Sequence, residues 1–191
     1  MRIAPTQRYG HAVLGDAIEA GGLRAILRDG RTVDYMLGED SVFEDLRPRL
    51  ADLDGDGRDE IILVRSYLAA GAALAVFGLR AGPLELLGET SPVGTPHRWL
   101  NPVGVGDFDG DGSDDILIPA MGRRALKIVS SAAGRFRELA TIEAEEPISG
   151  DVLTARSDGA EGLYVAIVLR PGRVMGLQSR PTAPAPARSA A

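Results

Sequence analysis

The feature that most constrains this chain is a nine-residue acidic loop that occurs twice, each time directly before an apolar run. The first loop covers residues 52–60 and precedes 61–64, and the second covers 107–115 and precedes 116–118. Both loops place aspartates at positions one, three and five and glycines at positions four and six. The loops begin 55 residues apart. A loop-and-strand unit that recurs at this spacing predicts a chain built from repeats of several short strands.

The composition favours β-structure. The 191 residues are 45% hydrophobic and 25% charged, which is ordinary for a globular protein. Aromatic residues make up only 5%, whereas 24 glycines and 12 prolines favour short strands joined by turns over long helices. Residues 38–46 could form a short turn of helix, but they have too few apolar side chains to define a stripe. We therefore predict an all-β fold.

Short apolar or alternating runs mark the expected strands. Before Pro48 they are 12–14, 23–27 and 32–37, and the Asp29-Gly30 pair between the last two is a strong hairpin signal. Four strands are expected around the first acidic loop, and the same order returns around the second. These strands are 50–53, 61–64, 73–79 and 84–87 in the first repeat, and 103–108, 116–119, 125–130 and 136–142 in the second.

A third copy of the unit has lost its acidic positions. Residues 158–165 align with 56–63, but Thr154 and Arg156 stand where the first two aspartates would be, and an arginine there is incompatible with a bound cation. We expect one repeat-built β domain over residues 1–178, followed by a disordered Pro/Ala tail, 179–191. The expected repeats cover about 10–47, 48–92, 93–146 and 147–178.

The two acidic loops predict metal sites. Oxygen ligands at alternate positions, with glycines that permit a tight turn, suit a hard divalent cation, and Ca²⁺ tolerates an irregular cage best. In such a loop, positions one, three and five supply carboxylates, position seven supplies a backbone carbonyl, and position nine closes the cage. Position eight, Asp59 or Asp114, is expected to face water. The predicted ligands of two Ca²⁺ ions are Asp52, Asp54, Asp56, the Arg58 carbonyl and Glu60, and then Asp107, Asp109, Asp111, the Ser113 carbonyl and Asp115.

Three other interpretations of the loops stay open. An EF-hand would require a bidentate Glu at position twelve and a flanking helix, but position twelve is Leu63 in one loop and Ile118 in the other. The loops could be metal-free Asp-Gly turns, in which the clustered carboxylates would repel one another. They could hold catalytic Mg²⁺, although no phosphate-binding Gly-Lys-Ser/Thr loop accompanies the acids.

The acidic loop, the apolar strand after it and the spacing of the two copies resemble the FG-GAP or VCBS repeats of integrin-α-like β-propellers. Residues 48–142 carry this likeness, and Glu60 departs from the more usual Asp at the closing position. The resemblance implies a propeller-like array of four-stranded antiparallel blades whose first strands line a central channel. The strands amount to about three and a half blades, whereas closed propellers have about 4–8. We therefore expect an incomplete or compact propeller, or a fragment of a longer one, with open blade edges that could pair two copies.

The resemblance also implies a calcium-binding module without catalytic activity, used for adhesion, binding or as a scaffold. The connection between repeats at 95–101 holds the only tryptophan and one of the two histidines. Its His97, Arg98, Trp99 and Asn101 could contact a protein or carbohydrate partner. The same loop could instead be structural, with Trp99 filling the inner channel and Arg98 bonding to a neighbouring blade.

The alternative function is an enzyme, such as a glycan hydrolase or lyase, or an accessory module of one. The sequence offers little for catalysis, because His11 lacks an acid–Ser pattern and no Gly-x-Ser-x-Gly elbow is present. The net charge of −6 argues against a nucleic-acid partner. The absence of cysteine excludes disulfides, zinc-thiolate sites and thiol nucleophiles.

The sequence carries no visible targeting signal. Its apolar runs are shorter than the roughly 18–20 residues of a membrane span, so membrane insertion is not expected. The first ten residues lack the pattern of a signal peptide, so the chain as given would stay in the cytosol. Cytosolic free calcium is low, and a missing N-terminal leader would reconcile the location with the metal. The resemblance implies a periplasmic or extracellular protein.

Overall fold

The computed structural model describes residues 1–10, 17–44, 47–79, 82–94, 104–132, 134–156, 163–169 and 172–178. Over these residues the chain forms fifteen strands and one turn of 3₁₀ helix at Met121–Arg123. All the strand pairs are antiparallel. The predicted all-β fold is confirmed. No helix in the described ranges is long and apolar enough to cross a membrane.

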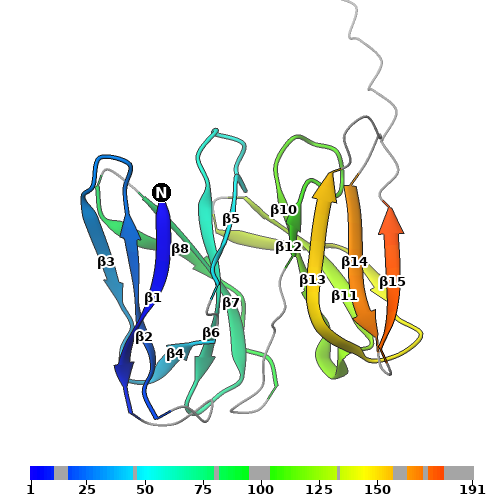
Figure 1. Cartoon of the computed structure of the whole chain (residues 1–191), viewed down its shortest axis with the longest axis horizontal. Helices are drawn as coiled ribbons and strands as arrows, with labels where there is room; N and C mark the ends of the chain where they lie inside the picture. Colours follow the sequence, from blue (N-terminus) through cyan, green and yellow to red (C-terminus); the bar gives the residue numbers. More distant parts are fainter. Residues whose placement is uncertain are drawn as a thin grey trace, which may run out of the picture.

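The strands form three sheets that follow one another along the molecule in chain order (Figure 1). The first sheet contains β1 (Arg2–Tyr9), β2 (Glu19–Ile26), β3 (Thr32–Met36), β4 (Ser41–Phe43), β5 (Arg49–Ala51), β6 (Glu60–Tyr67), β7 (Ala72–Leu79) and β8 (Leu84–Glu89). The second contains β9 (Gly104–Gly106), β10 (Asp115–Pro119), β11 (Ala125–Ala132) and β12 (Arg135–Glu143). The third contains β13 (Ile148–Arg156), β14 (Leu163–Leu169) and β15 (Arg173–Gln178).

The strands around the two acidic loops form two four-stranded meanders, which are adjacent to each other. Strands β5–β8 form the first meander, strands β9–β12 form the second meander, and β13–β15 form a three-stranded last sheet. The short strand β4 joins β1–β3 to the first meander, because it pairs with both β2 and β6. The eight strands expected around the acidic loops are all present. Strands β1 and β4 were not predicted, and β4 lies within the segment considered for a turn of helix.

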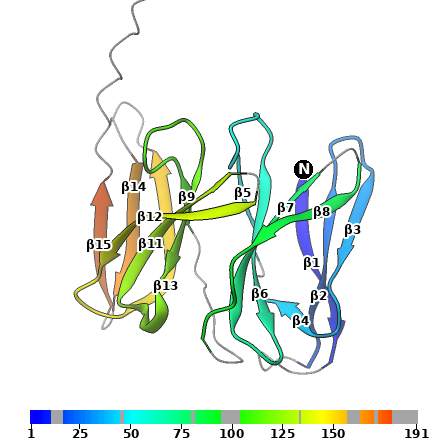
Figure 2. The same cartoon turned by 180° about the vertical axis from the view of Figure 1, so that it is seen from behind.

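The described sheets form an open row of blades, consistent with an incomplete propeller. The first strands of the units are neighbours, since β5 contacts β9 and β9 contacts β13. A Cβ atom at Gly104 of β9 would lie 2.9 Å from Val152 Cγ1 of β13, so these two strands approach very closely. The outer strands also meet, and β12 reaches across to β8 (Figure 2). This order of inner and outer strands is that of adjoining propeller blades.

The cores lie between neighbouring units, because the middle strands are apolar on both faces. In β6, Ile61 packs with side chains of β2 and β4, whereas Ile62 packs with the second meander. In β10, Ile116 packs with the first meander, whereas Leu117 packs with the last sheet. Successive side chains of a strand point to opposite faces, so an uninterrupted apolar run indicates a strand that is buried on both sides. The runs that follow the acidic loops have this role.

Candidate metal centres

The two acidic loops lie at the same end of the molecule, in adjacent meanders (Figure 1). The first connects β5 to β6 and the second connects β9 to β10. Both glycines of each loop adopt positive φ, a conformation that favours glycine because it has no Cβ. These angles are 72° at Gly55, 83° at Gly57, 81° at Gly110 and 95° at Gly112. The glycine spacing of the motif therefore sets the fold of both loops.

The first loop gathers three of its five predicted ligands. Oxygen atoms of Asp52, Asp54 and Glu60 lie within 4.8 Å of one another. Glu60 is buried and its Oε2 accepts a hydrogen bond from the Leu53 N–H at 3.0 Å. The Oδ2 atom of Asp52 accepts a hydrogen bond from the Gly57 N–H at 2.9 Å, while its Oδ1 atom is buried without a hydrogen-bond partner.

The second loop repeats this arrangement. Oxygen atoms of Asp107, Asp109 and Asp115 lie within 4.8 Å of one another. The buried Asp115 accepts a hydrogen bond on Oδ2 from the Phe108 N–H at 3.0 Å, as Glu60 does from Leu53. Asp107 accepts hydrogen bonds from the N–H groups of Gly110 and Gly112, at 2.6 and 3.2 Å. The same sequence pattern thus produces the same cluster at positions one, three and nine.

The carboxylates at position five stand apart from these two clusters. Asp56 accepts hydrogen bonds from the Arg58 N–H at 2.9 Å and from Arg58 Nη2 at 2.6 Å. Asp111 accepts a hydrogen bond from the Ser113 N–H at 2.8 Å. The contributions of Asp56, Asp111 and the carbonyls of Arg58 and Ser113 to a cation stay predictions.

Burial and repulsion from neighbouring carboxylates raise the pKa of the carboxyl group at position nine of each loop. Burial raises the pKa of Glu60, and the nearby Asp54, Asp56 and Asp52 act in the same direction, against the Leu53 hydrogen bond. Burial also raises the pKa of Asp115 to about 6, and the charges of Asp109, Asp111 and Asp107 add to the effect, against the Phe108 hydrogen bond. A bound cation would offset this repulsion and favour the ionised carboxylates. The all-oxygen donor sets and the unpartnered Asp52 Oδ1 therefore fit a hard divalent ion.

Position two of each loop is an apolar anchor that was not predicted. The Leu53 side chain packs in the core between the two meanders, and Phe108 packs against the core between the second meander and the last sheet. Their N–H groups bind Glu60 and Asp115, so each anchor connects a closing carboxylate to an interface between sheets. The available signal was the apolar residue between two aspartates in both copies.

Position eight differs between the two loops. Asp59 is exposed, as expected. The same expectation was wrong for Asp114, which is half-buried and contacts the first loop. The Asp114 N–H donates to the Asp52 carbonyl oxygen at 2.8 Å, and Asp114 Oδ2 accepts from the Asp52 N–H at 3.3 Å. The structure therefore joins the two loops directly.

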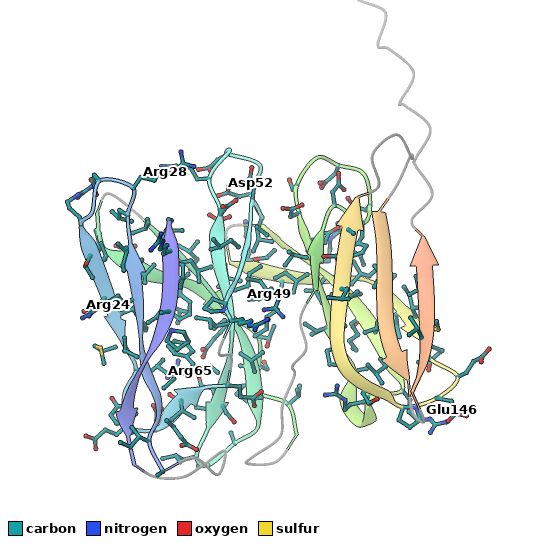
Figure 3. The ribbon with its side chains drawn as sticks, in the orientation of Figure 1. Arg24, Arg28, Arg49, Asp52, Arg65 and Glu146 are labelled. Atoms are coloured by element: carbon teal, nitrogen blue, oxygen red, sulfur yellow. The ribbon has the colours of Figure 1, made fainter. Side chains whose placement is uncertain are left out.

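A cavity of about 400 Å³ lies beside the first loop. Two arginines, Arg28 and Arg58, line this cavity. Figure 3 shows Arg28 at the same end of the molecule as Asp52. Arg58 pairs with Asp56 at 2.6 Å. The apolar lining residues are Met1, Leu27 and Leu79.

The other predicted candidates lie outside the described residues. These are the four side chains proposed for partner binding, together with His11, residues 157–162 of the third copy and the Pro/Ala tail; Thr154 and Arg156 of the third copy lie at the end of β13. The four are His97, Arg98, Trp99 and Asn101.

Residues 52–118 match the family model for the FG-GAP-like repeat. The match begins at the first aspartate of the first loop and ends in β10, so it contains both loops and strands β6–β9, but not β5. It confirms the resemblance inferred from the loops. A search of curated proteins found no match to the chain.

Proposed function

We propose that this chain is a non-catalytic binding or scaffold module whose FG-GAP-like repeats are stabilised by two Ca²⁺ ions. The observation that carries the proposal is the buried Oδ1 atom of Asp52, which has no hydrogen-bond partner within a cluster of three carboxylates. A buried polar atom without a partner costs free energy, and a buried anionic oxygen costs more. A cation in the loop would supply that partner.

The residues of each loop would hold one ion. Asp52, Asp54 and Glu60 would bind the first, with Asp56 and the Arg58 carbonyl completing the set. Asp107, Asp109, Asp115, Asp111 and the Ser113 carbonyl would bind the second. When bound, each ion supplies positive charge that offsets the repulsion among the clustered carboxylates. Because the unfolded chain has no preformed cluster, binding free energy becomes folding free energy.

The positions of the perturbed acids support a binding role over the enzymatic alternative. A glycan hydrolase needs a general acid and a second carboxylate on opposite sides of the bond that breaks. Among the described residues, the carboxyl groups with raised pKa are Glu60 and Asp115, which belong to separate loops and close the two clusters. The same chemistry favours a compartment outside the cytosol, where extracellular modules bind calcium with a Kd of about 10⁻⁴–10⁻³ M.

Thermal unfolding with calcium or with a chelator tests the proposal. At a free calcium concentration of about 100 times Kd, one site stabilises the fold by about 2.7 kcal/mol. For a domain of this size, 1 kcal/mol shifts Tm by roughly 2–4 °C. We therefore expect calcium to raise Tm by about 10–20 °C for two sites, and Mg²⁺ at the same concentration to raise it less.

Two variants provide controls for this experiment. Asp109→Ala should remove one site and about half of the calcium-dependent shift. A double variant, Asp52→Asn with Asp107→Asn, should remove most of the shift. A wild-type Tm that does not respond to calcium up to about 100 mM, roughly 100 times the weaker Kd expected, would overturn the proposal and favour the interpretation as metal-free turns.

A further inference from the structure

The contact between the two acidic loops has a consequence for how they bind ions. It joins position one of the first loop to position eight of the second, through the two hydrogen bonds between Asp52 and Asp114. We propose that Asp114 is a positioning residue that couples the two sites, so that the chain binds two Ca²⁺ ions with positive cooperativity. The inference rests on the proposed calcium sites and concerns the link between them.

The position of Asp114 couples the conformation of one loop to that of the other. It stands between Ser113 and Asp115, which are both predicted ligands of the second ion. Its two hydrogen bonds hold the backbone N–H and carbonyl of Asp52, the first predicted ligand of the other ion. The backbone of Asp52 determines where its unpartnered Oδ1 points. An ion that orders the second loop therefore also orders Asp52, and the first site then loses less conformational freedom when it binds.

The loops also approach closely beside this contact. A Cβ atom at Gly55 would lie 3.2 Å from Ser113 Oγ, which is tighter than ordinary packing. The absence of a side chain at Gly55, position four of the first loop, therefore allows the second loop to pack closely against it. The Asp114 carboxylate is not a predicted ligand, and its negative charge between the loops offsets part of the repulsion between two bound cations. Geometry and charge both favour the doubly bound state.

The chain itself offers a matched control. Asp59 occupies position eight of the first loop and carries the same charge, but it is exposed to solvent. Asp59→Ala therefore removes one carboxylate beside a metal loop without removing the contact between loops. Asp114→Ala removes a carboxylate at the equivalent position together with the acceptor for the Asp52 N–H. Asp114→Asn keeps an oxygen acceptor and removes the charge.

Calcium titration calorimetry on the full chain, at fixed ionic strength, tests the coupling. We expect the wild type and Asp59→Ala to bind two ions with a Hill coefficient above one, and the first ion to raise affinity for the second at least fivefold. Asp114→Ala removes the side-chain hydrogen bond and keeps the backbone one, so it should still bind two ions, with a Hill coefficient below that of the wild type. Asp114→Asn keeps an oxygen acceptor for the Asp52 N–H and should keep most of the cooperativity. If Asp114→Ala does not fold, comparison of the wild type with Asp109→Ala tests the coupling.

A double-mutant cycle makes the test site-specific. Coupling is reciprocal, so Asp109→Ala, which disables the second site, should weaken the first site by the same factor. In an Asp114→Ala background, Asp109→Ala should weaken the first site by a smaller factor, because the backbone hydrogen bond between the loops remains. Two independent sites in the wild type, or a coupling that Asp114→Ala does not reduce, would overturn the inference while leaving the proposed calcium sites intact. Absence of calcium binding in the wild type would overturn both.

Discussion

The close approach of the two meanders predicts a sharp effect for Gly88→Ala. Gly88 of β8 lies against Gly134, the residue directly before β12. A Cβ atom at residue 88 would lie 2.2 Å from the Gly134 carbonyl oxygen and 2.8 Å from its carbonyl carbon and Cα. These are backbone atoms that cannot rotate away. Gly134 would have to move by about 1 Å to restore van der Waals contact, next to Leu87 and Phe136, which pack on the core between the meanders.

The magnitude follows from this overlap. Overpacking of a well-filled contact costs typically about 1–3 kcal/mol, which for a domain of this size lowers Tm by roughly 2–12 °C. A control is Gly176→Ala in β15, where an added Cβ would have no atom within 4 Å. Alanine loses less backbone freedom than glycine on folding, so Gly176→Ala should leave Tm unchanged or raise it slightly. Differential scanning calorimetry in saturating calcium measures both variants. Equal melting temperatures for the two would refute the close packing of the meanders.

Three further predictions test the interior and its charges. Ile116→Ala, at a fully buried position between the meanders, should lower the free energy of unfolding by about 2–5 kcal/mol in urea titration, whereas Leu153→Ala, at a side chain 66% exposed, should change it by less than about 0.5 kcal/mol. Similar losses in both variants would contradict the assigned core. In chelator, the metal-free protein should lose stability as pH rises from about 4 to 6, because burial raises the pKa of Asp115 to about 6 and the folded state then holds its proton more tightly than the unfolded chain. Asp115→Asn should flatten this profile, and a wild-type profile that is already flat would refute the raised pKa. Tyr67→Phe removes the hydroxyl that donates to the Glu89 carboxylate at 2.6 Å and should lower the free energy of unfolding by about 1.5–3 kcal/mol. In the wild type, burial and Glu89 raise the pKa of Tyr67, so ultraviolet titration should show it ionising above the pH at which free tyrosine does.

The strands around the acidic loops could be predicted because their signals are local. Strands β6 and β10 each follow an acidic loop and consist of an apolar run that can be recognised without knowing its partner strand. Strand β1 lacked such a signal, since it mixes arginines, a proline and polar residues and is defined by its pairing with β2. Strand β4 has only three residues, and its role as a bridge between β2 and β6 depends on tertiary structure.

In the candidate sites, too, the features that depend on local sequence could be predicted, and those that depend on tertiary packing could not. The clusters at positions one, three and nine follow from nine consecutive residues, so the motif was sufficient to predict them. The contact of Asp114 with Asp52 joins residues 62 apart and depends on how two meanders pack. Asp59 and Asp114 are the same residue at the same position of the same motif, yet one is exposed and the other is half-buried. Local sequence cannot distinguish them, because the difference lies in what stands beside each loop.

The anchors at position two suggest why some copies keep their acids and one does not. Leu53 and Phe108 each place an apolar side chain in an interface with the following sheet, and each N–H binds the closing carboxylate of its own loop. An ion that fixes the carboxylate therefore also fixes that interface. In the third copy the equivalent residue is the small, exposed Ala155, between Thr154 and Arg156. On that sheet the side chains of Leu153 and Val174 are 66% and 70% exposed, and no described sheet covers them. Ligands and anchor are thus retained where the described chain has a further sheet to fix, and both are absent where it has none.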